Sequence, residues 1–99
     1  VVVVASGADR VDTAAVGREL GAEWVGRADA GTVRTATGYP IGGVSPVGLD
    51  PALPVLVDQT LAGFDVVWAA AGTPHAVFPT SFSEIVHLTG GRPCSVRQR

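Results

Sequence analysis

The sequence predicts one small domain of the α/β or α+β class, in which short helices cover a sheet. Composition is the first reason: 46% of the 99 residues are hydrophobic and 16% are charged, which excludes intrinsic disorder. The second is that β-branched runs alternate with segments that carry helix-capping residues at both ends. No repeat or linker interrupts the chain, so residues 1–99 are expected to be a single domain. No apolar run approaches the roughly 20 residues of a transmembrane helix, so no membrane partner is expected.

The amino-terminal part is expected to begin with a strand and a helix. Residues 1–5 are a β-branched run followed by a turn, which is typical of a buried strand. Asp12 is placed to cap a helix whose apolar residues recur at four-residue spacing, and Gly21 is placed to end it. A short strand is expected over residues 23–26.

A second helix and a long shaped loop are expected next. Asp29 is placed to cap the helix, Val33 and Ala36 to face inward, and Gly38 to end it. Residues 39–54 then contain three glycines and four prolines, a composition that favours a loop over a helix.

The carboxyl-terminal half is expected to mix strands with one helix. The expected elements are a strand over 53–57, a turn over 58–61, a strand over 64–71, its hairpin partner over 75–78, a helix between Ser81 and Gly90, and an edge strand over 93–96. Ser81 and Glu84 match a capping box at the start of that helix. Trp68, inside an apolar strand, is expected in the core.

The charged residues limit the classes of partner. All seven basic residues are arginines, there is no lysine, and the net charge is −2. A domain that coats nucleic acid by counterion release should be clearly basic, so DNA binding is not expected and any nucleic-acid contact must be local, at a strand end. The single cysteine, Cys94, gives no disulfide framework and fits a cytoplasmic protein. The lack of methionine, even at position 1, favours missing upstream sequence.

The strongest functional candidate is the loop Thr-Gly-Tyr-Pro-Ile-Gly-Gly-Val-Ser-Pro-Val-Gly at residues 37–48. Adjacent glycines at Gly42 and Gly43 allow positive φ and close approach of a ligand, and flanking prolines stiffen the loop. Such a loop can aim main-chain N–H and C=O groups at a ribose or an acyl ester. The alternative is a tight connection between a helix and a strand. Ser45 is not expected to be a hydrolase nucleophile, because Val47 stands where a nucleophile elbow requires glycine.

Other candidates lie at the ends of apolar strands. Asp58 is expected either at the edge of a site or as the cap of the next turn. Gly72 and Thr73 can supply backbone donors to an oxyanion or a phosphate, or form an ordinary turn. Tyr39, beside the glycine loop, is the best candidate for stacking on a base. The histidines and Cys94 lack the close spacing of zinc ligands, so no metal site is expected.

The glycine loop and its surroundings resemble the YbaK/prolyl-tRNA-synthetase-associated editing domain family. The matching positions are Thr37 to Tyr39, Gly42 to Pro46 and Gly48, with flanking matches at strand 1–5, helix 12–20, residues 55–58, residues 70–72 and the closing helix with Ile85. Members of this family hydrolyse the ester that joins a wrong amino acid to the 3′ end of a tRNA. Their fold is a mixed, strongly curved sheet with helices packed around it.

The resemblance implies an aminoacyl-tRNA deacylase that acts on the acceptor end of tRNA in the cytoplasm, with water as co-substrate and no cofactor. A synthetase is an implied partner where it delivers the tRNA. The implied substrate-binding residues come from the loop and from two strand ends: Tyr39, Gly42, Gly43, Val44, Ser45, Pro46, Asp58, Gly72 and Thr73. Gly72 and Thr73 are expected to face the loop across a pocket, and Asp58 to orient the loop. Walls of Val and Ala suit a small amino acid.

Two polar groups of the family pattern are absent. Members commonly carry a lysine before the strand that matches residues 1–5, and an aspartate where this protein has Ser95. The catalytic residue is therefore unknown. One hypothesis is an active hydrolase domain whose upstream segment holds the lysine. The other is an inactive module that binds tRNA ends or a synthetase.

Overall fold

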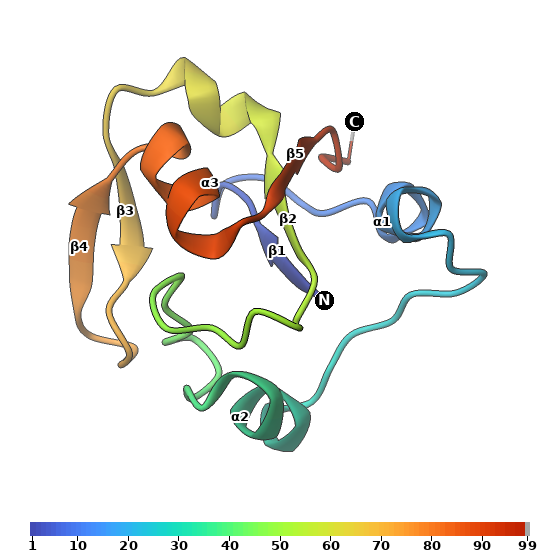
Figure 1. Ribbon diagram of the computed structural model, residues 1–99, viewed down its shortest axis with the longest axis horizontal. Helices are drawn as coiled ribbons and strands as arrows, with labels where there is room; N and C mark the ends of the chain where they lie inside the picture. The colour runs from blue at the N-terminus through green and yellow to red at the C-terminus, as the bar shows by residue number, and fades with distance from the viewer. Residues whose placement is uncertain (99) are drawn as a thin grey trace.

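The structure is a computed structural model that describes residues 1–98 (Figure 1). The elements are β1 (Val2–Val4), α1 (Thr13–Leu20), α2 (Ala30–Thr37), β2 (Val55–Asp58), the 3₁₀ helix η1 (Gln59–Gly63), β3 (Val67–Ala70), β4 (Val77–Thr80), α3 (Phe82–Thr89) and β5 (Arg92–Cys94). The predicted class, with strands and short helices mixed along the sequence, is confirmed.

The strands form two sheets. One is parallel with the order β1-β2-β5, and the other is the antiparallel hairpin β3-β4. Parallel and antiparallel pairing both occur, as expected, but each kind is confined to its own sheet and is not mixed within one. The hairpin lies on the opposite side of the molecule from α1, and α3 lies between the hairpin and the parallel sheet (Figure 1).

The core is built on both faces of β2, the central strand. Leu56 packs on one face with Val16 of α1, and Val57 packs on the other with Leu61 and Ile85. All four residues of β2 are buried, as is usual for a parallel strand covered on both faces. Side chains of alternate residues point to opposite faces, which explains the two separate clusters.

The predicted helix boundaries are confirmed by the capping contacts. The carboxylate of Asp12 accepts hydrogen bonds from the first turn of α1, and that of Asp29 accepts from Thr32 N–H at 2.7 Å. Ser81 Oγ accepts from Glu84 N–H at 3.2 Å at the start of α3. All three α-helices end in a glycine with left-handed φ, between 64° and 77°. Each side-chain cap of this kind stabilises its helix by about 1 kcal/mol.

Several local expectations are wrong. Residues 23–26 form no strand, and Trp24 there is 82% exposed. Ala36 is exposed, so only Val33 of that pair turns inward. Trp68 is 66% exposed, so the expectation that it lies in the core is wrong. The strand partnered with β3 begins at Val77, later than expected.

Candidate functional site

The glycine loop starts from the carboxyl end of α2. Thr37 Oγ1 donates to the Val33 carbonyl at 2.7 Å and accepts from Tyr39 N–H at 3.1 Å, which ties the start of the loop to the helix. A turn follows, closed by a 2.9 Å hydrogen bond from Gly43 N–H to the Pro40 carbonyl. Its third residue, Gly42, has φ of 83°, a conformation that favours glycine in such turns.

Tyr39 braces the loop from inside. Its hydroxyl donates a hydrogen bond to the Val47 carbonyl, which joins the start of the loop to its end. The ring lies against Gly72, where a Cβ would stand 3.4 Å from a ring carbon. Because Gly72 also has φ of 101°, a side group there would be strained and crowded. The hydroxyl of Tyr39 is therefore engaged within the protein.

Gly43 lies directly against the turn that follows β3. A Cβ on Gly43 would stand 2.7 Å from the carbonyl carbon of Thr73 and 2.9 Å from its Cα. The structure thus brings the loop and the 72–74 turn together, whereas the resemblance led us to expect them to face each other across a pocket. They are in contact at this point, however, and no ligand fits between Gly43 and Thr73.

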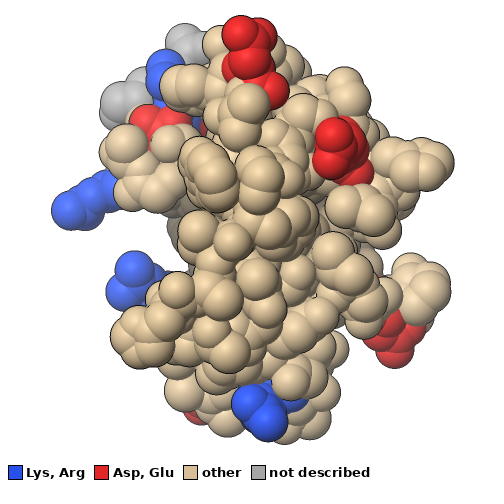
Figure 2. Space-filling view, turned by 90° about the vertical axis from the view of Figure 1, so that its left-hand side faces the viewer, with Lys and Arg blue, Asp and Glu red and all other residues tan. Residues whose placement is uncertain are grey.

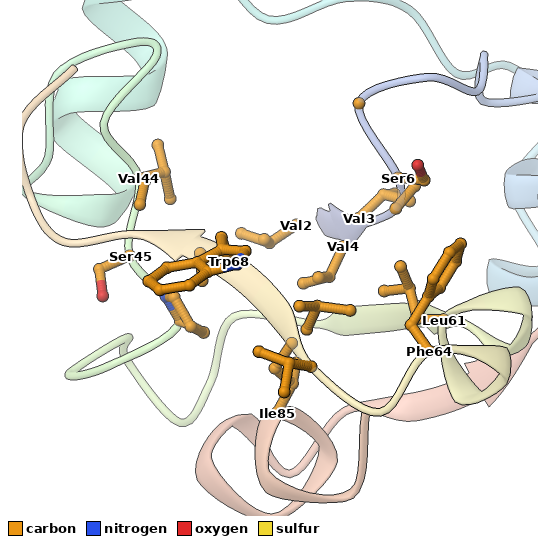
Figure 3. Close-up of a pocket in the computed structure, with 17 residues that line it drawn as sticks. Val2, Val3, Val4, Ser6, Val44, Ser45, Leu61, Phe64, Trp68 and Ile85 are labelled. Carbon is orange, nitrogen blue, oxygen red and sulfur yellow. The ribbon is translucent and has the colours of Figure 1, made fainter. Parts of the chain in front are cut away.

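A cavity of about 420 Å³ lies beside the loop. It is lined by residues 2–7, 44–46, 61, 64, 66–70 and 85. Figure 3 shows Val44 and Ser45 at one end and Leu61 and Phe64 at the other. Its walls are apolar apart from main-chain groups, the indole N–H of Trp68 and two serine hydroxyls, and no titratable group is among the lining residues. Of the expected site residues, Val44, Ser45 and Pro46 line this cavity.

Ser45 is the polar residue at the loop end of the cavity. It is 3% exposed, and its Oγ accepts from Val47 N–H at 3.2 Å. Val44 and Ser45 both line the cavity, and their N–H groups donate to no other residue among 1–98. No histidine or carboxylate lines the cavity, so these residues do not assemble a serine–base pair.

Asp58 is not among the residues that line the cavity. It is completely buried, and its Oδ2 accepts a hydrogen bond from Thr60 Oγ1 at 2.7 Å. Oδ1 has no partner among the described residues. The structure gives no contact through which Asp58 orients the loop.

Cys94 is a buried thiol, and its burial raises its pKa. The nearby carboxylates of Glu19 and Asp58 raise this pKa further, while the guanidinium of Arg92 lowers it.

Charged residues form no patch on the face of the molecule that Figure 2 shows. On the face in Figure 2 the arginines and acids are scattered among uncharged residues.

Residues 1–98 contain no group of three or more His, Cys, Asp or Glu placed to hold a metal ion. None of the helices in this range is long and apolar enough to cross a bilayer.

The fold and the loop define a small α/β domain with a glycine-rich loop that is braced by internal hydrogen bonds. The sequence profile of the aminoacyl-tRNA editing domain family matches residues 1–88. The protein belongs to this family.

Three solved structures share the fold. The first is described as a candidate trans-editing enzyme for prolyl-tRNA synthetase; it is 37% identical, with a TM-score of 0.89 over 98% of the present sequence. A second structure comes from work on grafting linear epitopes onto scaffold proteins. It is 36% identical, with a TM-score of 0.88 over 98% of the present sequence. The third is a hypothetical protein, APE2540, which is 33% identical, with a TM-score of 0.87 over 97% of the present sequence. The 99 residues span only 61–64% of the length of these structures.

Most of the cavity wall was not expected from the sequence. Residues 2–6 and 66–70 line it, yet their β-branched and apolar pattern indicates only buried strands. Which strand edge stays open depends on the pairing of strands far apart in the sequence, and hydrophobic periodicity carries no signal for that.

Proposed function

We propose that this protein binds the aminoacylated 3′ end of a tRNA and hydrolyses the ester of a wrongly attached small amino acid. The observation that carries the proposal is the braced loop at residues 39–48, whose Val44 and Ser45 N–H groups are free beside an apolar cavity. Membership of the editing domain family supports it. The similar candidate trans-editing enzyme for prolyl-tRNA synthetase supports a cytoplasmic role beside a synthetase, with a proline tRNA that carries a wrong small amino acid as the first substrate to test.

An aminoacyl ester is already activated, so its hydrolysis needs a placed water and a stabilised oxyanion more than a strong nucleophile. A rigid loop offers main-chain N–H donors without reorganisation, and loss of one such donor typically costs about 10²–10³ in kcat. Because Ser45 Oγ accepts the Val47 N–H, its own O–H is free to donate to the ribose or to the water.

The apolar walls select by size. One methylene more or less in such a pocket changes binding by roughly 1–3 kcal/mol, so discrimination among small amino acids is about 10–200-fold. No titratable group lines the cavity, so the proton of the attacking water passes to the amine of the substrate or to polypeptide outside these residues.

The alternative function is an inactive module that binds tRNA ends or a synthetase. The absence of titratable groups from the cavity walls favours it, together with the serine at position 95.

A deacylation assay separates the two functions. The protein is incubated with tRNAs that carry a wrong small amino acid, and ester loss is compared with the spontaneous rate. Gly42→Val should abolish turnover, because φ at this position is 83° and the turn must rearrange. Gly63→Ala is the matched control, since no atom lies within 4 Å of the added Cβ and φ is ordinary. Saturable tRNA binding without turnover would contradict the hydrolase and support the inactive binding module.

A further inference from the structure

Trp68 is the largest side chain among the residues that line the cavity, and it is 66% exposed. Its neighbours in β3, Val67 and Ala69, are half-buried, and Val67 packs against the core cluster that contains Val57 and Ile85. Successive residues of a strand point to opposite faces, so Trp68 turns away from that core. Exposed apolar surface beside a cavity is typical of a binding site.

The other aromatic residues near the cavity are less suited to contact a ligand at the glycine loop. Tyr39, which we expected to stack on a base, is not among the lining residues, and its ring lies against Gly72. Phe64 lines the cavity but stands at the end opposite the loop (Figure 3). In the same view the indole of Trp68 extends from β3 toward Ser45. An aromatic surface and the braced loop therefore border the same end of the cavity.

The cavity offers few charged contacts to a nucleic-acid end. No arginine is among its lining residues, and the net charge of the protein is −2. A tRNA end bound here therefore gains little affinity from neutralised phosphates. Stacking of a base on an aromatic side chain needs no charge, and it is the other main source of affinity for single-stranded ends.

We propose that Trp68 stacks on the adenine of the 3′-terminal nucleotide of the tRNA and so recognises the end that all tRNAs share. This inference rests on the proposed function, because it places the ester of that nucleotide at the loop. The base and the ester are joined to one ribose, so the base must lie beside the loop end, toward which the indole extends (Figure 3). Trp68 stands opposite Pro79 in the hairpin, and cross-strand neighbours lie within reach of each other, so the rigid proline ring restricts the indole.

A double-mutant cycle between the base and the indole tests the proposal. One ligand is 3′-deoxy-3′-(alanylamino)adenosine, whose amide resists hydrolysis. The other is the same aminoacyl sugar with hydrogen in place of the adenine. Calorimetry gives the Kd of both ligands for the parent, for Trp68→Leu and for the matched control Trp24→Leu. Trp24 is the other tryptophan; it is 82% exposed and is not among the residues that line the cavity.

Removal of the base should weaken binding to the parent about 5–150-fold, the range for stacking of one base on an aromatic side chain. Trp68→Leu should lose the same factor for the adenosine analogue and nothing for the sugar without a base. Trp24→Leu should bind both ligands as the parent does. If Trp68→Leu weakens both ligands equally, or leaves the effect of the base unchanged, the proposal is overturned.

Fluorescence gives a second measurement that does not depend on the folding of Trp68→Leu. In Trp24→Leu the remaining indole is that of Trp68, so its emission reports on the cavity alone. The adenosine analogue should quench this emission, and the sugar without a base should leave it unchanged. Equal responses to the two ligands would contradict stacking.

Deacylation kinetics separate a failure of this proposal from a failure of the proposed function. Stacking is the same in the ground state and the transition state, so Trp68→Leu should raise KM for mischarged tRNA and leave kcat nearly unchanged. If the parent hydrolyses the ester or binds tRNA ends and Trp68→Leu does so equally well, stacking is wrong and the proposed function stands. If the parent neither hydrolyses the ester nor binds tRNA ends, both are wrong.

Discussion

The contact between Gly43 and the 72–74 turn makes a quantitative prediction. In Gly43→Ala the new Cβ would lie 2.7 Å from the Thr73 carbonyl carbon and 2.9 Å from its Cα, against ordinary contacts of 3.4–4 Å. Both atoms belong to the backbone, so relief requires a backbone shift of several tenths of an ångström. Overpacking of this kind costs about 1–3 kcal/mol, which for a domain of this size lowers Tm by roughly 4–8 °C per kcal/mol.

The assay is urea and thermal unfolding followed by circular dichroism, with Gly63→Ala as the matched control. The control should stay within about 0.5 kcal/mol of the parent, because its Cβ meets no atom within 4 Å. The double variant Gly43→Ala/Thr73→Gly should not recover stability, since truncating Thr73 leaves the clashing backbone atoms in place. Parental stability of Gly43→Ala, or rescue by the second substitution, would refute this packing.

Three further predictions concern single residues. Tyr39→Phe loses the hydrogen bond to the Val47 carbonyl and should lower the free energy of unfolding by about 0.5–1.5 kcal/mol in urea titrations. Asp29 accepts Thr32 N–H, which holds the pKa of its carboxyl below the ordinary 3.8. Its contribution to stability is therefore present above pH 3.8 and lost as the pH falls through the lower, folded-state pKa; the Tm difference between Asp29→Ala and the parent should vanish there. Cys94 is buried with a raised thiol pKa, so iodoacetamide should label it at pH ~8 only after unfolding; rapid labelling of the native protein would contradict its burial.

Local signals in the sequence predicted the helices well. Asp12, Asp29 and Ser81 cap as expected because capping depends on residues within one turn. The loop was predictable for the same reason, since its glycines and prolines restrict the backbone locally. Its contact with the 72–74 turn was anticipated only through the family resemblance.

The exposure of Trp68 and the surroundings of Asp58 depend on tertiary packing, which local sequence patterns do not reveal. An apolar segment around Trp68 indicates a buried strand, yet this residue is exposed, because burial depends on which elements pack over that face of the hairpin. Asp58 follows a buried strand, a position compatible with a site edge. In the structure it accepts a hydrogen bond from Thr60 and is not among the residues that line the cavity.

The two hypotheses about activity meet at the cavity beside the glycine loop. Val44 and Ser45 lie at one end of this cavity (Figure 3), and no titratable group is among its lining residues. Under the proposed function, these residues would bind and size the substrate, and the proton acceptor would be the substrate amine or polypeptide outside residues 1–98. Turnover in the deacylation assay would support the hydrolase, and saturable binding without turnover would support the inactive module.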